Sequence, residues 1–206
     1  MRRLLQPGIQ LIRQHLSTYL IINVSFYGLV VLGAAYAFID PRAQQTLTRS
    51  ILQSFSSGPM GAAKDAYLSG NVASAALMTF LVNTFLGSML ALTVPSMVIP
   101  FAGTFIGLLR ALLWGVALAP SSPELARAMV PHSLVLLLEG QGYILAMFGV
   151  HVLWASALDG MKRGPRGLAW GYLAGLRRNL YIYALVMTTL AVSAVYEAFE
   201  VIYLVR

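Results

Sequence analysis

The sequence contains no cysteine and few charged residues. None of its 206 residues is Cys, which excludes disulfide bonds, thiolate nucleophiles and cysteine-ligated iron–sulfur clusters. Charged residues make up 10% of the chain and hydrophobic residues 58%, whereas soluble domains carry roughly 25% charged residues. Helices of a soluble protein still need polar outer faces, and this composition does not supply them. We therefore expect an integral membrane protein without a soluble domain.

Sequence signatures of catalysis and ligand binding are also missing. The chain has no P-loop, no G-x-S-x-G and no H-E-x-x-H, and no strand pattern precedes Gly140-Gln141-Gly142 to make it a nucleotide fingerprint. The net charge of +7 would suggest nucleic acid in a soluble protein, but here basic residues lie between apolar runs, as membrane topology requires. We expect a lipid bilayer as the environment and no enzymatic activity, cofactor, metal or nucleic-acid partner.

Apolar runs predict an all-α polytopic bundle of about five transmembrane helices, which form one domain over residues 1–206. A span needs roughly 20 apolar residues. The charge-free run from Ala66 to Leu109 is too long for one crossing, and Pro95 and Pro100 predict a reversal inside it. The predicted spans cover residues 19–39, 71–94, 98–119, 132–158 and 179–204.

Two amphipathic segments predict helices that lie in the plane of the lipid headgroups. In residues 2–16, the apolar positions form one helical stripe, and arginines supply positive charge. That stripe consists of Leu5, Ile9, Ile12 and Leu16. In residues 42–55, Leu47, Ile51 and Phe55 fit one helical face, and the following Ser-Ser-Gly-Pro predicts its end.

The distribution of basic residues predicts the orientation. The predicted linker between the fourth and fifth spans, residues 159–178, holds five basic residues against one acid, and the N-terminal segment holds three arginines and no acid. Five crossings place both segments on one side, which the positive-inside rule makes cytoplasmic. We expect a multi-pass protein of the inner (plasma) membrane with a cytoplasmic N-terminus. Trp170 and Tyr172, beside the basic residues, are typical of interface anchors.

The first span allows a second interpretation. Ala35-Tyr36-Ala37 resembles the A-x-A cleavage site of a signal peptide. We expect the segment to be retained as a transmembrane span.

Ionisable residues within the spans are costly in a bilayer and are therefore the most informative polar positions. A helical rise of ~1.5 Å per residue puts Arg110, Glu139 and Glu197 ~10–13 Å below the outer surface on three helices. This matched depth predicts an ion pair of Arg110 with Glu139 or Glu197. The pair either fixes the register of the helices or lines a polar path.

Other polar residues in the spans receive more modest roles. We expect His151 to hydrogen-bond to a neighbouring helix, and Asn83 to face the same bundle interior. Both are predicted to belong to one intramembrane polar network with Arg110, Glu139 and Glu197. His132 and His15 lie at the predicted interfaces. Glu200, one turn nearer to water than Glu197, is expected to be a solvated residue at a helix end.

Small residues recur at every fourth position of the third span. Gly103, Gly107, Ala111 and Gly115 form a stripe that permits close approach of helix backbones. The stripe predicts that this span lies at the centre of the bundle. Gly33 stands in a span without such a stripe, so we expect Gly107→Leu to disrupt the fold more than Gly33→Leu.

Two short stretches carry a family resemblance. The first runs from Asn83 through Gly87 and the Pro95 turn to Gly107, and the second is Pro131-His132-Ser133 at the entry of an apolar helix. Together they resemble the stage II sporulation protein M family over the second to fourth spans. In that family Pro-His-Gly opens the helix, and the glutamate comes about a turn earlier than here.

In this sequence Leu136 occupies the slot of that glutamate, the acid is Glu139, and Ser133 replaces the glycine. The resemblance implies a protein of the bacterial inner membrane with five or more spans. It also implies a non-catalytic role as a scaffold for other proteins.

The sequence leaves two functional classes. A structural or scaffolding subunit, packed against other integral membrane proteins or in a homo-oligomer, explains the small-residue stripe and the absence of a catalytic set. Alternatively, the chain is a small transporter or channel with a polar path lined by Arg110, Glu139 and Glu197. An intramembrane enzyme would need a Ser–His couple across helices.

Overall fold

The computed structural model describes residues 2–54, 58–164 and 166–204, and every regular element in these ranges is a helix. The predicted all-α class is confirmed. The helices are α1 (Arg2–Gln14), α2 (Leu16–Ile39), α3 (Pro41–Ser54), α4 (Gly58–Leu68), α5 (Val72–Leu81), the π-helix η1 (Val82–Thr93), α6 (Val94–Val98), α7 (Ala102–Ala117), α8 (Pro123–Met161) and α9 (Gly167–Tyr203).

Four helical segments are long and apolar enough to cross a membrane. They are α2, the continuous segment Val72–Val98, α8 and α9, and they make this chain a multi-pass membrane protein. Helix α7 is apolar but has 16 residues. Its length is about 24 Å at 1.5 Å per residue, against roughly 30 Å of hydrocarbon. The predicted count of five spans is therefore not confirmed, since α7 covers the third predicted span.

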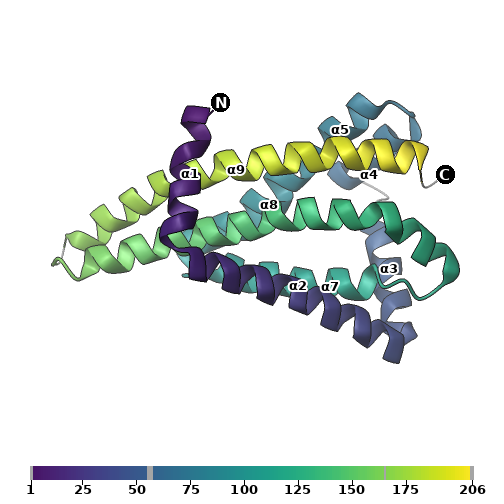
Figure 1. Ribbon diagram of the computed structural model, residues 1–206, viewed down its shortest axis with the longest axis horizontal. Helices are drawn as coiled ribbons and strands as arrows, with labels where there is room; N and C mark the ends of the chain where they lie inside the picture. The colour runs from purple at the N-terminus through teal and green to yellow at the C-terminus, as the bar shows by residue number, and fades with distance from the viewer. Residues whose placement is uncertain (1, 55–57, 165, 205–206) are drawn as a thin grey trace.

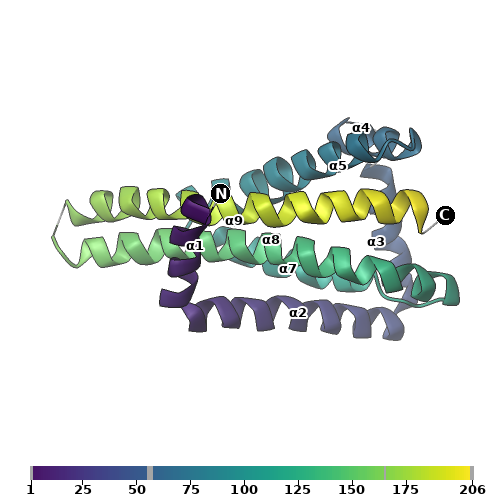
Figure 2. The same cartoon turned by 45° about the horizontal axis from the view of Figure 1, so that its top comes forward.

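The long helices form an antiparallel bundle (Figure 1). Helices α8 and α9 make a long hairpin, α7 lies against α2, and α5 lies against α9. Helices α2, α7 and α9 run toward the end that holds the C-terminus, whereas η1 and α8 run back (Figures 1 and 2). The apolar segments thus alternate in direction. Helix α1 crosses the bundle near the opposite end, where its Leu11 is buried in the main core.

Close backbone contact joins α2 to α7. A Cβ added at Gly33 would overlap the carbonyl oxygen of Leu112 and lie 3.1 Å from the Gly115 Cα. At Gly107, by contrast, it would meet the side chain of Met147. The expectation that Gly107 is the more restricted position is therefore wrong, because a methionine side chain can move and a helix backbone cannot. The partner of Gly33 is the small-residue stripe of α7 itself.

The helices of the α8–α9 hairpin extend beyond their predicted ends. Residues 159–178 were expected to form a linker, but α8 continues to Met161 and α9 starts at Gly167. The two backbones touch here, since a Cβ at Gly171 would overlap the Ser156 carbonyl oxygen. At its other end α8 begins at Pro123, with Ser122 accepting a hydrogen bond from the Leu125 amide at 3.3 Å. That start lies well before the predicted residue 132.

The second predicted span is not a regular α-helix. Asn71 caps α5 by accepting a hydrogen bond from the Ser74 amide at 3.1 Å. The helix then widens into the 12 residues of η1 and tightens again in α6. The chain reverses after Ile99, where Phe101 adopts a left-handed φ of 61°, so Pro95 lies inside a helix. Wide π-turns occur frequently at functional sites.

Helix α3 lies across the C-terminal end of the bundle (Figure 1). Its Gln44 is buried, where its Nε2 donates to the Ala119 carbonyl oxygen at 2.8 Å and its Oε1 accepts from the Ser121 hydroxyl at 2.6 Å. These bonds tie α3 to the end of α7. Of the second predicted amphipathic helix, Phe55 lies outside the described residues, as do Ser56 and Ser57 of the predicted break.

Candidate functional site

A cavity of about 370 Å³ lies between the helices at the end of the bundle that α3 covers. Helices α3, α4, α5, α7, α8 and α9, together with η1, all contribute to its wall. The polar side chains in its wall include those of Tyr67, Thr79, Asn83, Arg110, His132, Glu139 and Glu197. The cavity therefore gathers the three charges whose depths matched in the sequence. We call it the polar cavity.

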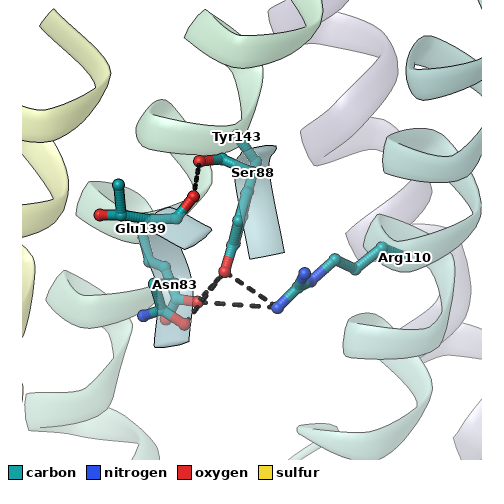
Figure 3. A network of polar contacts seen from close by, with 6 residues as sticks. Asn83, Ser88, Arg110, Glu139 and Tyr143 are labelled. Carbon is teal, nitrogen blue, oxygen red and sulfur yellow. Dashed lines mark hydrogen bonds and ion pairs between the residues drawn. The ribbon is translucent and has the colours of Figure 1, made fainter. Parts of the chain in front are cut away.

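A network centred on the Tyr143 hydroxyl connects Asn83, Arg110 and Glu139 (Figure 3). The Tyr143 hydroxyl accepts a hydrogen bond from Arg110 Nη2 at 2.9 Å and lies 2.8 Å from Glu139 Oε1 and 3.1 Å from Asn83 Oδ1. Arg110 Nη2 and Glu139 Oε1 are 4.0 Å apart. The predicted ion pair is thus present, with a tyrosine hydroxyl as an additional bridge. Side chains from α7, η1 and α8 meet in this network.

Aromatic rings hold Arg110 in place. Its guanidinium carbon lies 4.1 Å from the centre of the Tyr143 ring and 5.3 Å from that of Trp114, within range of a cation–π interaction. Gly87 of η1 leaves the necessary room, since a Cβ there would lie 2.6 Å from the Tyr143 oxygen and 3.2 Å from Arg110 Nη1. Sequence reasoning missed Tyr143. Its position one turn after Glu139 could have indicated that the two side chains lie on the same face of the helix.

Two further acids, Glu197 and Glu200, lie near the C-terminal end of α9. Glu200 is 1% exposed, and its Oε2 lies 3.1 Å from Nδ1 of His132. The expectation that Glu200 is solvated is wrong, because α8 begins before His132 and covers this part of α9. Among the described residues, Glu197 Oε2 and Glu200 Oε1 are buried without a hydrogen-bond partner.

Tyr67 of α4 closes the cavity from the side. Its hydroxyl lies 2.8 Å from Thr79 Oγ1 of α5. Burial raises the pKa of the Tyr67 phenol, and the charge of Glu197 adds to the increase. Tyr67 therefore stays protonated under ordinary conditions, and its hydroxyl remains available as a hydrogen-bond donor.

His151 does not belong to this site. Its ring centre lies 6.3 Å from that of His15, at the junction of α1 and α2, and 6.0 Å from that of Phe101. This junction is at the end of the bundle away from α3 (Figure 1). The structure thus separates His151 from Arg110, so the prediction of one polar network that contains both is wrong for His151.

The small-residue stripe of α7 positions the site rather than lining it. Gly103, Gly107, Ala111 and Gly115 are all buried. A Cβ at Gly103 would overlap the carbonyl oxygen of Leu92, and one at Gly115 would overlap that of Val30. These contacts fix α7 against η1 and α2, so that Arg110, next to Ala111, is directed into the cavity.

Acidic groups outnumber basic groups in and around the cavity. Three carboxyl groups, those of Glu139, Glu197 and Glu200, face one arginine and one histidine. Among the described residues, no group of three His, Asp or Glu side chains could hold a metal ion.

Comparison with protein-family models, curated proteins and solved structures finds no match to this chain.

Proposed function

We propose that the protein is a small membrane transporter or channel whose polar cavity binds a proton or a small organic cation. The observation that carries this proposal is the excess of carboxyl groups over cationic groups around one cavity at the level of the spans. A carboxylate without a partner is costly inside a bilayer. A species that brings positive charge removes this cost, and Glu197, with its unpaired Oε2, is the side chain placed to receive it.

The walls of the cavity suit such a species. A volume of about 370 Å³ is within the range of ligand sites, roughly 300–1,000 Å³. Trp114 and Tyr67 present aromatic groups to the cavity, and aromatic faces attract ammonium groups. The wide π-helix η1 supplies Asn83 to the same wall, which agrees with the frequent placement of π-turns at functional sites.

A structural subunit is the second candidate. It is favoured by the exposed apolar face of α2, where Val24 is 74% and Val31 67% exposed. Such a face fits another integral membrane protein or a second copy of this chain, although lipid also covers apolar faces. The resemblance to the stage II sporulation protein M family implies the same scaffolding role.

We further propose that α7 completes a fifth crossing and that the N-terminus is cytoplasmic, in an inner membrane. The alternating directions of the apolar segments support five crossings. The basic residues of α1 and of the α8–α9 hairpin lie toward the same half of the bundle (Figure 1), which supports a cytoplasmic N-terminus under the positive-inside rule.

Flux into liposomes tests the transport proposal. The purified protein is reconstituted with a pH-sensitive dye inside the vesicles, and proton or methylammonium entry is driven by a potassium diffusion potential. We expect flux with the native chain, its loss in Glu197→Gln and its retention in Glu124→Gln, an exposed acid of α8 paired with Arg127. Equal thermal unfolding of the three proteins shows that folding is intact.

The structural-subunit proposal predicts a different result. The native chain then gives no flux of either ion, and Glu197→Gln leaves the complex with its partner proteins unchanged. Absence of flux from a folded, correctly inserted native chain would overturn the transport proposal.

A further inference from the structure

A second cleft, of about 700 Å³, lies in the α8–α9 hairpin. Figures 1 and 2 show the tip of this hairpin extending beyond α1 and beyond the ends of the other helices. We call it the hairpin cleft. The residues of its wall that matter here are Ser156, Asp159, Arg163, Arg166, Trp170 and Arg178. It is separate from the polar cavity and shares no residue with it.

The charge of the hairpin cleft is positive. Its acid, Asp159, forms an ion pair with Lys162 at 2.8 Å, and no carboxylate of the described residues lies within ion-pair distance of Arg163, Arg166 or Arg178. The cleft also contains the N-terminus of α9, where Arg166 makes no capping hydrogen bond with its side chain. The amide groups of this first turn add positive partial charge. The cleft therefore suits an anion.

The side chain of Arg178 points along α9 toward the tip of the hairpin. Its Nη1 donates to the Ser156 hydroxyl at 3.0 Å, and Ser156 packs against Gly171 of α9. Arg178 is seven residues from Gly171, or ~10 Å along the helix axis. The guanidinium is thus displaced toward the tip, which is how a long basic side chain reaches the headgroup region from a helix in the membrane.

Apolar side chains accompany the arginines on the surface of the hairpin. Trp170 is 71% exposed, and Leu173 is 55% exposed. An exposed tryptophan beside arginines is typical of the membrane–water interface. This combination favours a ligand in the headgroup layer over one free in solution.

We propose that the hairpin cleft binds the phosphate group of an anionic membrane lipid. The guanidinium groups of Arg163, Arg166 and Arg178 surround the phosphate, because an arginine presents paired N–H donors that match phosphate oxygens. Trp170 anchors the hairpin at the same depth. This site is independent of the proposed function of the polar cavity.

Binding of phosphatidylglycerol in neutral detergent micelles tests the site, with phosphatidylcholine as the neutral lipid and free glycerol phosphate as the soluble headgroup. The test variant is Arg163→Gln with Arg166→Gln, two exposed residues at the tip. The matched control is Arg42→Gln with Arg49→Gln, two exposed arginines of α3 at the other end of the bundle. Apparent affinity is measured by titration of thermal unfolding and by native mass spectrometry.

We expect the native chain to bind phosphatidylglycerol more tightly than phosphatidylcholine. Each arginine near an anionic headgroup contributes about fivefold, so the double variant at the tip should bind about 25-fold more weakly. The control should bind like the native chain. Equal loss in the control, equal affinity for both lipids, or binding of free glycerol phosphate without a preference for the lipid would each overturn the proposal.

Discussion

His132 of α8 and Glu200 of α9 are held together inside the protein, with 3.1 Å between Nδ1 and Oε2. The glutamate is 1% exposed, and its other oxygen has no partner among the described residues. This contact joins the two longest helices near the C-terminal end. It also places a carboxyl group directly behind the polar cavity, since His132 lines that cavity.

Removal of the histidine from this pair should destabilise the protein. His132→Leu leaves Glu200 buried without its hydrogen-bond partner, and a buried polar group left without its partner costs about 1–3 kcal/mol. The variant His132→Leu with Glu200→Leu should be milder, because no buried polar group is left without a partner. Thermal unfolding in detergent measures both. A double variant that is as unstable as His132→Leu would contradict this reading of the pair.

Removal of one partner should also destabilise the network of Arg110, Glu139 and Tyr143. Arg110→Met removes the cation that faces Glu139 and the donor to Tyr143, so we expect a loss of about 3–5 kcal/mol. Replacement of both Arg110 and Glu139 by Met should restore part of that stability. If the double variant folds well and loses proton or methylammonium flux, the charges serve transport. If it folds well and the native chain shows no flux, the pair is structural.

The Tyr143 bridge gives a finer test of the same network. Tyr143→Phe keeps the ring beneath Arg110 and removes the hydroxyl that lies between Arg110, Glu139 and Asn83. We expect a loss of about 1–3 kcal/mol in stability, the usual cost of a buried polar group left without its partner. Tyr36→Phe is the control, since that hydroxyl has a single weak bond of 3.4 Å to Asp40. Equal stability of the two variants would show that the bridge contributes nothing.

The sequence predicted the main apolar segments because a charge-free run has few alternatives to a membrane helix. It also predicted the meeting of Arg110 with Glu139, because helical rise alone fixes their depth. Helix ends were predicted poorly. The predicted span began at residue 132 and ended at residue 158, whereas α8 runs from Pro123 to Met161. The residues by which α8 exceeds the predicted span are mostly exposed, so the apolar pattern that marks the span does not extend to them.

Other parts of the site depend on which side of a helix faces its neighbours. Tyr143 in a span reads as an ordinary apolar residue, and nothing in its spacing shows that its ring lies over Arg110. Glu200 was expected in water because it lies one turn nearer to the end of its helix than Glu197, and that position does not show that α8 packs against it. The glycines Gly167, Gly171 and Gly175 recur at every fourth position and did carry a signal, but the charges around them favoured a linker.

Gly33 and Gly28 of α2 form a matched pair for testing the α2–α7 contact. A Cβ at Gly33 would overlap the Leu112 carbonyl oxygen, whereas one at Gly28 meets nothing within 4 Å. Gly33→Ala should therefore destabilise the protein by about 1–3 kcal/mol, the usual cost of overpacking. Gly28→Ala should be neutral or stabilising, because alanine has the higher helix propensity. Thermal unfolding that ranks the two variants in the opposite order would contradict close packing of α7 on α2.

Single cysteines placed in this cysteine-free chain test whether α7 crosses the membrane. Ile99 lies in the reversal before α7, and Ser121 lies in the turn after it; both are exposed. If α7 completes a crossing, a membrane-impermeant thiol reagent should label Ile99→Cys and Ser121→Cys from opposite sides. Ser17→Cys, at the start of α2, should label from the same side as Ile99→Cys, because α2 and the Val72–Val98 segment run in opposite directions. Labelling of Ile99→Cys and Ser121→Cys from one side would make α7 a re-entrant helix. The chain would then have four crossings, and its two termini would lie on the same side.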